Sequence, residues 1–114
     1  LLDLQAWTLA FWRSGLRDVN YRRFFDVNDL LGLRVEDAAV FDATHATVLR
    51  WVEERLVDGL RIDHVDGLRD PLGYLQRLRR EVDARRPGED VPIFVEKILS
   101  PGEKLRDEWP VDGT

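Results

Sequence analysis

The start of the chain carries apolar residues at the spacing of a helix. They stand at Leu1, Leu4 and Phe11, with Thr8 as a partial exception. Because residues three to four apart share one face of a helix, this spacing predicts a helix over residues 1–12. Gly15 is a plausible end for it, since glycine often follows the last helical turn.

Residues 16–36 show no clean period and are interpreted as a long, locally folded loop. A second helical pattern follows. Asp42 is a good N-cap for it, because its side chain can accept hydrogen bonds from the free N–H groups of a first turn. The apolar positions then continue to Leu56, and Gly59 is the predicted terminator.

Two short apolar runs, residues 60–63 and 91–95, are typical of buried strands. Between them Asp70-Pro71 resembles an N-cap followed by proline at the first helical position, and Pro87-Gly88 ends the pattern. The apolar stripe of this helix consists of Leu72, Leu75, Leu78 and Val82. The sequence therefore predicts a strand, a helix and a strand, with the two strands parallel.

The element order is typical of an α/β fold, with residues 1–58 as a helical and loop region and residues 59–114 as a strand–helix–strand unit. A closed (β/α)8, or TIM, barrel needs roughly 250 residues. We therefore expect a partial TIM barrel within one domain. An incomplete barrel leaves strand edges unpaired, so the isolated chain is expected to self-associate through them.

Carboxylates follow both predicted strands. Arg61 and Asp63 are two residues apart in a strand-like run, so they share one face, and Glu96 follows the second run. Parallel strands would bring both acids to one sheet edge, where paired carboxyl groups suit glycosidic-bond chemistry. A guanidinium beside Asp63 would keep it ionised and aimed. The plainer alternatives are a turn cap for Asp63 and a salt bridge for Glu96.

Other polar and aromatic residues allow more than one interpretation. His64 and Asp66 are candidates for binding sugar hydroxyls, although Asp66-Gly67 also suits a simple turn. A metal site is disfavoured, because too few ligands surround them. His45, inside the second predicted helix, is interpreted as structural. The aromatic residues Trp7, Trp12, Tyr21, Phe24 and Phe25 either stack on sugar rings or belong to the core.

Composition and charge limit the classes of molecule that the chain is expected to bind. The 114 residues are 44% hydrophobic and 34% charged, which is ordinary for one globular domain. The net charge of -5 disfavours nucleic acid, and neither a spanning apolar run nor a signal peptide is present, so no membrane is expected. The absence of cysteine excludes disulfides and thiolate metal sites and fits the cytoplasm. The absence of methionine suggests a piece of a longer protein.

Three stretches carry a family resemblance. Residues 59–63 (Gly-Leu-Arg-Ile-Asp) resemble the fourth-strand signature of the α-amylase superfamily, and Val95-Glu96 resembles its fifth-strand signature. More narrowly, residues 20–30, 61–68 and 96–99 resemble the maltooligosyl trehalose synthase family. The resemblance implies strands 4 and 5 of a (β/α)8 barrel with flanking helices and a long inserted loop.

The resemblance also implies roles. Asp63 would be the nucleophile, Glu96 the general acid/base and Arg61 the partner of the nucleophile, while the third catalytic carboxylate lies outside the chain. Substrate-binding roles are expected for His64, Asp66, Tyr21, Arg22 and Lys97. The implied reaction turns the reducing-end α-1,4 linkage of a maltooligosaccharide into an α-1,1 linkage, without metal or cofactor. The alternatives are another α-glucan hydrolase or transglucosylase, or an inactive isolated fragment.

Overall fold

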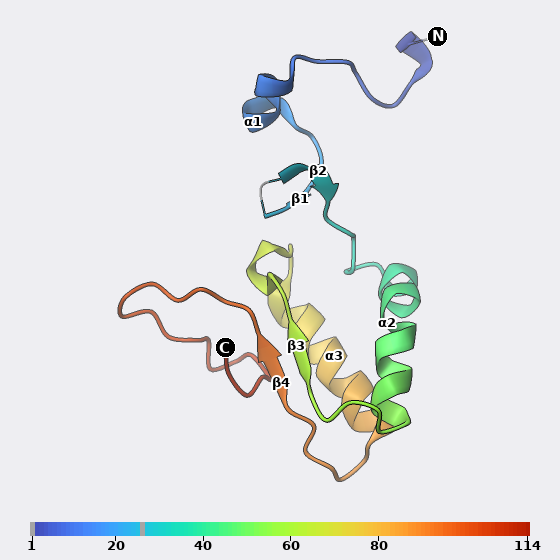
Figure 1. Ribbon diagram of the computed structural model, residues 1–114, viewed down its shortest axis with the longest axis vertical. Coiled ribbons are helices and arrows are strands. Elements are labelled where there is room, and N and C mark those ends of the chain that lie inside the picture. The colour runs from blue at the N-terminus through green and yellow to red at the C-terminus, as the bar shows by residue number, and fades with distance from the viewer. Residues whose placement is uncertain (1, 26) are drawn as a thin grey trace. The chain divides into compact units, whose positions relative to one another are not determined.

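The computed structural model describes residues 2–25 and 27–114. The chain divides into two compact units, Leu1–Gly32 and Leu33–Thr114. The second unit contains helix α2 (Ala38–Glu53), strand β3 (Leu60–Ile62), the short 3-10 turn η3 (Val65–Gly67), helix α3 (Pro71–Arg85) and strand β4 (Ile93–Val95). Figure 1 shows α2, α3 and the two strands side by side. The mixed helix and strand composition predicted for this region is confirmed.

Strands β3 and β4 pair in parallel, with Leu60 opposite Ile93 and Ile62 opposite Val95. This confirms the predicted parallel pair, although both strands are shorter than residues 60–63 and 91–95. Gly59 is needed where the strands approach, because a Cβ there would lie 3.0 Å from the Pro92 carbonyl oxygen. Gly59 therefore serves strand pairing and does not terminate a helix.

Helix α3 begins and packs as its sequence predicts. The Asp70 carboxylate accepts a 2.9 Å hydrogen bond from the Gly73 N–H, and Pro71 is the first helical residue. Its apolar stripe enters the core, where Leu75, Leu78 and Val82 are at most 1% exposed. The buried residues around this stripe are Phe41, Leu49, Val52, Val65, Tyr74, Val91, Ile93, Val95 and Trp109.

The predicted bounds of the second helix were wrong at both ends. The N-cap of α2 is Asp37, whose side chain accepts a 2.9 Å bond from the Ala39 N–H. Asp42 lies inside the helix and pairs with Arg77 of α3 at 2.8 Å. The helix ends at Glu53, because Arg55 takes a left-handed backbone conformation with φ of 57°.

The first unit departs most from prediction. Instead of a helix over residues 1–12 it contains a 3-10 turn, η1 (Leu2–Leu4), and a second one, η2 (Trp12–Ser14); residue 1 lies outside the described residues. Leu4 is 86% exposed, so the apolar spacing has no buried face to favour a helix here. Gly15 follows η2 as its C-cap and begins the short helix α1 (Gly15–Asp18), so it does not end a helix over residues 1–12.

Residues 16–36, predicted to be a loop, contain an antiparallel hairpin. Its strands are β1 (Arg23–Phe24) and β2 (Val27–Leu31). The Arg23 guanidinium donates a 2.6 Å hydrogen bond to the side-chain oxygen of Asn28. Asn28 also accounts for the glycine at position 15, because a Cβ there would lie 2.7 Å from the side-chain nitrogen Nδ2 of Asn28.

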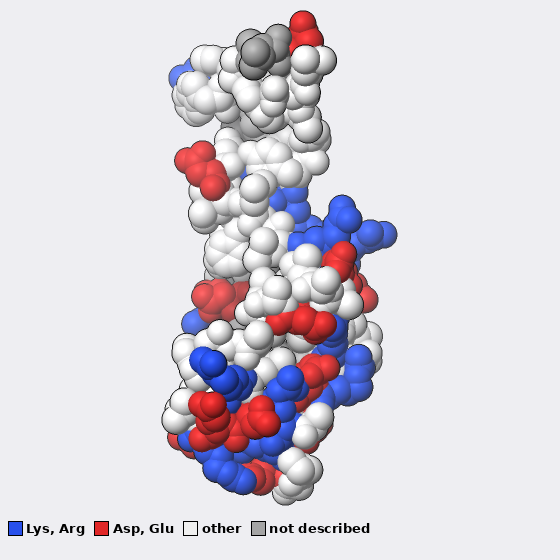
Figure 2. All heavy atoms as spheres, turned by 90° about the vertical axis from the view of Figure 1, so that its right-hand side faces the viewer, with Lys and Arg blue, Asp and Glu red and all other residues white. Residues whose placement is uncertain are grey.

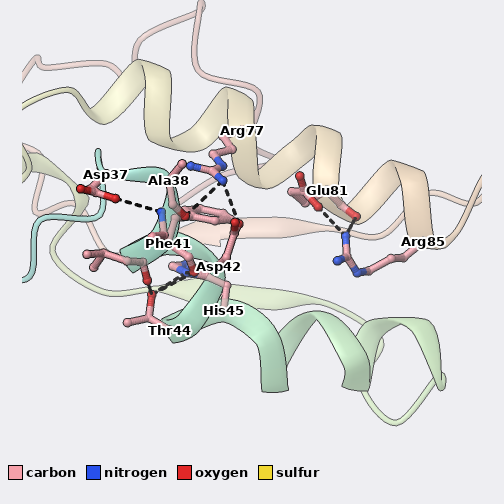
Figure 3. Close-up of polar contacts among 11 residues, drawn as sticks. Asp37, Ala38, Phe41, Asp42, Thr44, His45, Arg77, Glu81 and Arg85 are labelled. Carbon is pink, nitrogen blue, oxygen red and sulfur yellow. Dashed lines mark hydrogen bonds and ion pairs between the residues drawn. The ribbon is translucent and has the colours of Figure 1, made fainter.

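A polar and aromatic cluster joins α2 to α3 (Figure 3). The His45 ring stacks on Phe41 with centroids 4.0 Å apart, and the Arg77 guanidinium carbon lies 4.2 Å above the centroid of the same phenyl ring. The His45 Nδ1 faces the Phe41 carbonyl at 3.0 Å, so this nitrogen carries the proton and Nε2 accepts from the Tyr74 hydroxyl at 2.8 Å. His45 is thus structural in this unit, as predicted.

Burial lowers the pKa of His45 below its ordinary 6.5, and nearby Arg77 lowers it further, while the Phe41 carbonyl and Asp42 oppose this. Burial also raises the pKa of Tyr74 to about 12, so its hydroxyl keeps its proton at neutral pH. The folded protein therefore binds a proton at His45 less readily than the unfolded chain.

We expect the free energy of unfolding to decline as pH falls through about 6.5. The free energy of unfolding should keep declining until the pH has passed below the lowered folded-state pKa of His45. Above pH 6.5 the stabilising contribution of His45 is complete. Urea unfolding at pH 7.5 and 5.5 measures this, and the His45→Gln variant should lose less stability between the two values. His64→Gln controls for the loss of an imidazole outside the cluster. An equal decline in wild type and His45→Gln would contradict the assignment.

Candidate active site

The two candidate carboxylates stand just beyond neighbouring parallel strands. Asp63 follows β3, and Glu96 follows β4. The Glu96 N–H donates a 2.7 Å hydrogen bond to the Ile62 carbonyl, which continues the strand ladder one residue past β4. Both acids therefore lie at the carboxyl end of the pair, the edge at which α/β enzymes place their chemistry.

The Arg61 guanidinium joins these carboxylates. Its Nη1 lies 3.0 Å from Asp63 Oδ1, and its Nη2 lies 3.7 Å from Glu96 Oε1. Arg61 and Asp63 share a face as the strand spacing predicted, and the expected convergence of the two acids is present. A single cation between two carboxylates holds both in register and offsets their mutual repulsion.

The two acids differ in surroundings. The Asp63 side chain is 56% exposed, whereas that of Glu96 is 31% exposed. The Oε2 atom of Glu96 is buried and has no hydrogen-bond partner among residues 2–25 and 27–114. Phe94 shares the strand face of Glu96 and is 42% exposed, so apolar surface borders this carboxyl group. An accessible carboxylate beside a cation and a shielded carboxyl group suit different chemical roles.

The loops after the strands are tied by charged side chains. His64 has a left-handed backbone conformation with φ of 54°. Its ring packs against Gly67, because a Cβ added to that glycine would lie only 2.2 Å from His64 Nε2. Its Nδ1 is 3.7 Å from Asp66 Oδ1. The Lys97 ammonium lies 3.9 Å from Asp66 and 3.0 Å from Glu103. The Asp66-Gly67 turn is therefore present, and sugar binding by these residues stays a prediction.

A pocket of about 510 Å³ opens beside these loops in the second unit. Asp66, Lys97 and Glu103 line it, together with the buried Trp109. Asp63 and Glu96 do not line it. The loops that follow the two candidate carboxylates thus share a polar recess that the carboxylates themselves do not line.

Tyr21 and Arg22 belong to the first unit. The Tyr21 hydroxyl donates a 2.8 Å bond to the Asn28 carbonyl, and Arg22 packs against Gly32, whose added Cβ would be 3.1 Å from Arg22 Cγ. Trp7, Trp12 and Tyr21 line a pocket of about 750 Å³ and are 54%, 68% and 42% exposed. These aromatics are therefore not core within this unit, while their role in sugar stacking stays a prediction.

Charge over the second unit is mixed. Figure 2 shows basic and acidic side chains interspersed on the visible face of Leu33–Thr114. Among residues 2–25 and 27–114, no three histidine or acidic side chains gather as metal ligands would. The helices of this described part are too short or too polar to cross a bilayer.

Sequence reasoning missed one contact beside Glu96. The Thr114 hydroxyl accepts a 3.1 Å bond from the Lys97 N–H and donates a 2.9 Å bond to the Lys97 carbonyl. No local pattern signals this contact, because the two residues are 17 positions apart. It appears only once the chain after Ser100 returns to the edge of β4.

Comparison with known proteins gives consistent results. Two proteins named putative maltooligosyl trehalose synthase, from Mycobacterium tuberculosis strains CDC 1551 / Oshkosh and ATCC 25618 / H37Rv, are each 53% identical over 112 residues. The alignment covers 98% of this chain and 14% of each relative.

Solved structures give the same result. Those of maltooligosyltrehalose synthase from Arthrobacter ramosus, native and as a point mutant, are 48% identical with TM-scores of 0.84 and 0.83, and the match covers 98% of this chain and 14% of theirs. No protein-family model matches the chain. Over nearly its whole length, the chain is thus homologous to one segment of maltooligosyl trehalose synthase.

Proposed function

We propose that the chain is the segment of a maltooligosyl trehalose synthase that carries two of its catalytic carboxylates. The enzyme converts the reducing-end α-1,4 linkage of a maltooligosaccharide into an α-1,1 linkage by retaining intramolecular transglucosylation. One observation carries the proposal: Asp63 and Glu96 follow adjacent parallel strands and lie 3.0 and 3.7 Å from the same Arg61 guanidinium. The 53% identity to named synthases over 98% of the chain supports the narrower assignment.

The first step breaks the terminal α-1,4 bond. Glu96 gives its proton to the glycosidic oxygen as the Asp63 carboxylate attacks the anomeric carbon from the opposite face. The products are a covalent glycosyl–Asp63 ester and a free glucose that stays in the site. Arg61 holds the Asp63 carboxylate in line for this attack, which the 3.0 Å contact supports.

The second step forms the α-1,1 bond. The retained glucose turns over, and Glu96, now a carboxylate, removes the proton from its anomeric hydroxyl as that oxygen attacks the ester carbon. Asp63 leaves as a carboxylate. Two inversions at one carbon restore the α configuration, and atoms balance without metal or cofactor. Water must be excluded during this step, since its attack would give hydrolysis.

Substrate contacts are assigned to the loops at the same edge. His64, Asp66 and Lys97 would bind sugar hydroxyls near the carboxylates, since charged and imidazole groups donate or accept such bonds. Tyr21 and Arg22 would contact the glucan chain from the first unit, where exposed aromatics offer stacking surfaces.

For the fold, the parallel β3–α3–β4 unit suits strands 4 and 5 of a (β/α)8 barrel, with the acids at the catalytic end. Unpaired strand edges of such a partial barrel would let the isolated chain self-associate.

Product analysis tests the function. The intact enzyme carrying this chain is incubated with maltopentaose, and reducing ends are counted beside the mass of the product. We expect reducing ends to disappear while the mass stays that of maltopentaose, because isomerisation adds no water. Maltopentaitol, whose end is already reduced, is the matched control and should not react. New reducing ends with shorter products would instead show an α-glucan hydrolase or transglucosylase, the alternative function. Assaying the 114 residues alone beside the intact enzyme tests the alternative of an inactive fragment.

A further inference from the structure

A third extended segment lies along the free edge of β4. The Asp112 N–H donates a 2.8 Å hydrogen bond to the Ile93 carbonyl, and the Val95 N–H donates a 3.0 Å bond to the Gly113 carbonyl. Phe94 and Gly113 form a parallel bridge between these bonds. Figure 1 shows the end of the chain returning to β4 in this way. Residues 112 and 113 therefore run parallel to β4 and pair with it through one isolated bridge.

Arg79 of α3 fixes this register. Its Nη2 donates a 2.9 Å bond to Asp112 Oδ2, and the same oxygen accepts a 2.7 Å bond from the Ile93 N–H. Arg79 also donates to the carbonyls of Val91, at 2.8 Å, and Pro110, at 3.3 Å. The arginine side chain is 19% exposed, so these charge-assisted bonds are largely shielded from water. The segment is thus anchored to both the helix and the strand.

Thr114 belongs to this segment, and its hydroxyl holds the Lys97 peptide. It accepts from the Lys97 N–H at 3.1 Å and donates to the Lys97 carbonyl at 2.9 Å. The peptide that precedes Glu96 is held as well, because the Glu96 N–H donates a 2.7 Å bond to the Ile62 carbonyl of β3. Both peptide planes that flank the Glu96 Cα are therefore held, one by β3 and one by the returning segment. Since a residue has only two soft backbone dihedrals, this fixes the direction in which the Glu96 Cα–Cβ bond leaves the backbone.

We propose that Thr114 is a positioning residue for Glu96. The inference rests on the proposed function, in which Glu96 exchanges a proton with the glycosidic oxygen. Glu96 Oε2 has no donor among the described residues, and Oε1 has the 3.7 Å contact with Arg61, so a fixed backbone adds to what the side-chain contact alone can orient. Displacement of a reacting group by about 1 Å costs on the order of 100-fold in rate. Water replacing the hydroxyl would solvate the Lys97 peptide without fixing its plane.

The test compares Thr114→Val, which keeps the shape and removes the hydroxyl, with Thr114→Ser, which keeps the hydroxyl, in the intact enzyme. We expect Thr114→Val to lower kcat about tenfold with KM changed less than about twofold, and to displace the limb of the kcat–pH profile assigned to Glu96. Thr114→Ser should restore kcat to within about twofold of wild type. Thr47→Val, an exposed threonine of α2, is the matched control and should leave kcat unchanged.

Three results would overturn the inference: a Thr114→Val kcat within about twofold of wild type, failure of Thr114→Ser to rescue, or a lowered kcat with an unmoved pH profile, which indicates a merely structural role. If Thr114→Val does not fold, Thr114→Ala makes the same comparison with a smaller side chain. A wild-type enzyme that hydrolyses instead of isomerising refutes the proposed function alone, because Glu96 would still protonate the leaving group and the variants can be scored on hydrolysis.

Discussion

Replacing Asp63 by Asn is expected to lower kcat for α-1,1 bond formation by at least about 10³-fold, because an amide cannot form the glycosyl ester on which both steps depend. Asn keeps the shape of the side chain and can still contact Arg61, so the loss reports nucleophilicity and not packing. Turnover is measured with maltopentaose. Intact-protein mass after rapid quenching should show a glycosylated species in the wild type and none in the variant.

The matched control for this change is Asp58→Asn. Asp58 is exposed and lies five residues before Asp63 in the turn that leads into β3. Its replacement should leave kcat within about twofold, since surface changes away from a site rarely matter. Circular dichroism of both variants establishes that they are folded. Near-normal formation of α-1,1 product by Asp63→Asn would refute its assignment as nucleophile.

The contacts around Asp63 are better explained by function than by stability. Arg61 and Asp63 are 63% and 56% exposed, and ion pairs this exposed contribute only about 0–1 kcal/mol to folding. The strand places the pair beside Glu96, at the edge where the loops converge. An arginine that stabilises the fold so little but contacts both acids would, in the proposed mechanism, orient them.

The strand–helix–strand unit was predictable because its signals are local. Asp70 and Pro71 mark the start of α3 within two residues, and the stripe through Leu75 and Leu78 sets its buried face. Parallel pairing follows from the helix between the strands, and it alone brings Asp63 and Glu96 together.

The parts that sequence reasoning missed depend on partners far away in the chain. Asp37 and Asp42 are both good caps by type. The structure shows that Asp37 accepts the capping bond, whereas Asp42 lies inside α2 and contacts Arg77. The spacing of Leu4 and Phe11 suggested a helix, but these side chains are exposed, and a short helix without a packing face is unstable. The Thr114 contact likewise depends on a strand pairing that no local pattern indicates.

Replacing Glu96 by Gln is expected to lower kcat on maltooligosaccharides by about 10²- to 10⁴-fold, the usual contribution of a positioned general acid. Gln matches the size of Glu and keeps the backbone bond from residue 96 to Ile62, so the strand ladder should survive. Glu53→Gln, an exposed glutamate at the end of α2, is the matched control and should retain wild-type kcat.

A change of leaving group distinguishes the proposed roles of Glu96 and Asp63. An α-maltosyl fluoride releases fluoride without needing a proton, so Glu96→Gln should form the Asp63 ester from it at a rate within about tenfold of wild type, although turnover stays slow because the second step needs a base. Asp63→Asn should fail with both substrates, because the nucleophile is required whatever leaves. Burst kinetics of fluoride release measure the first step directly. Equal losses of Glu96→Gln on the fluoride and on maltopentaose would show that this residue positions or stabilises the site without donating the proton, and the acid would then have to be sought elsewhere.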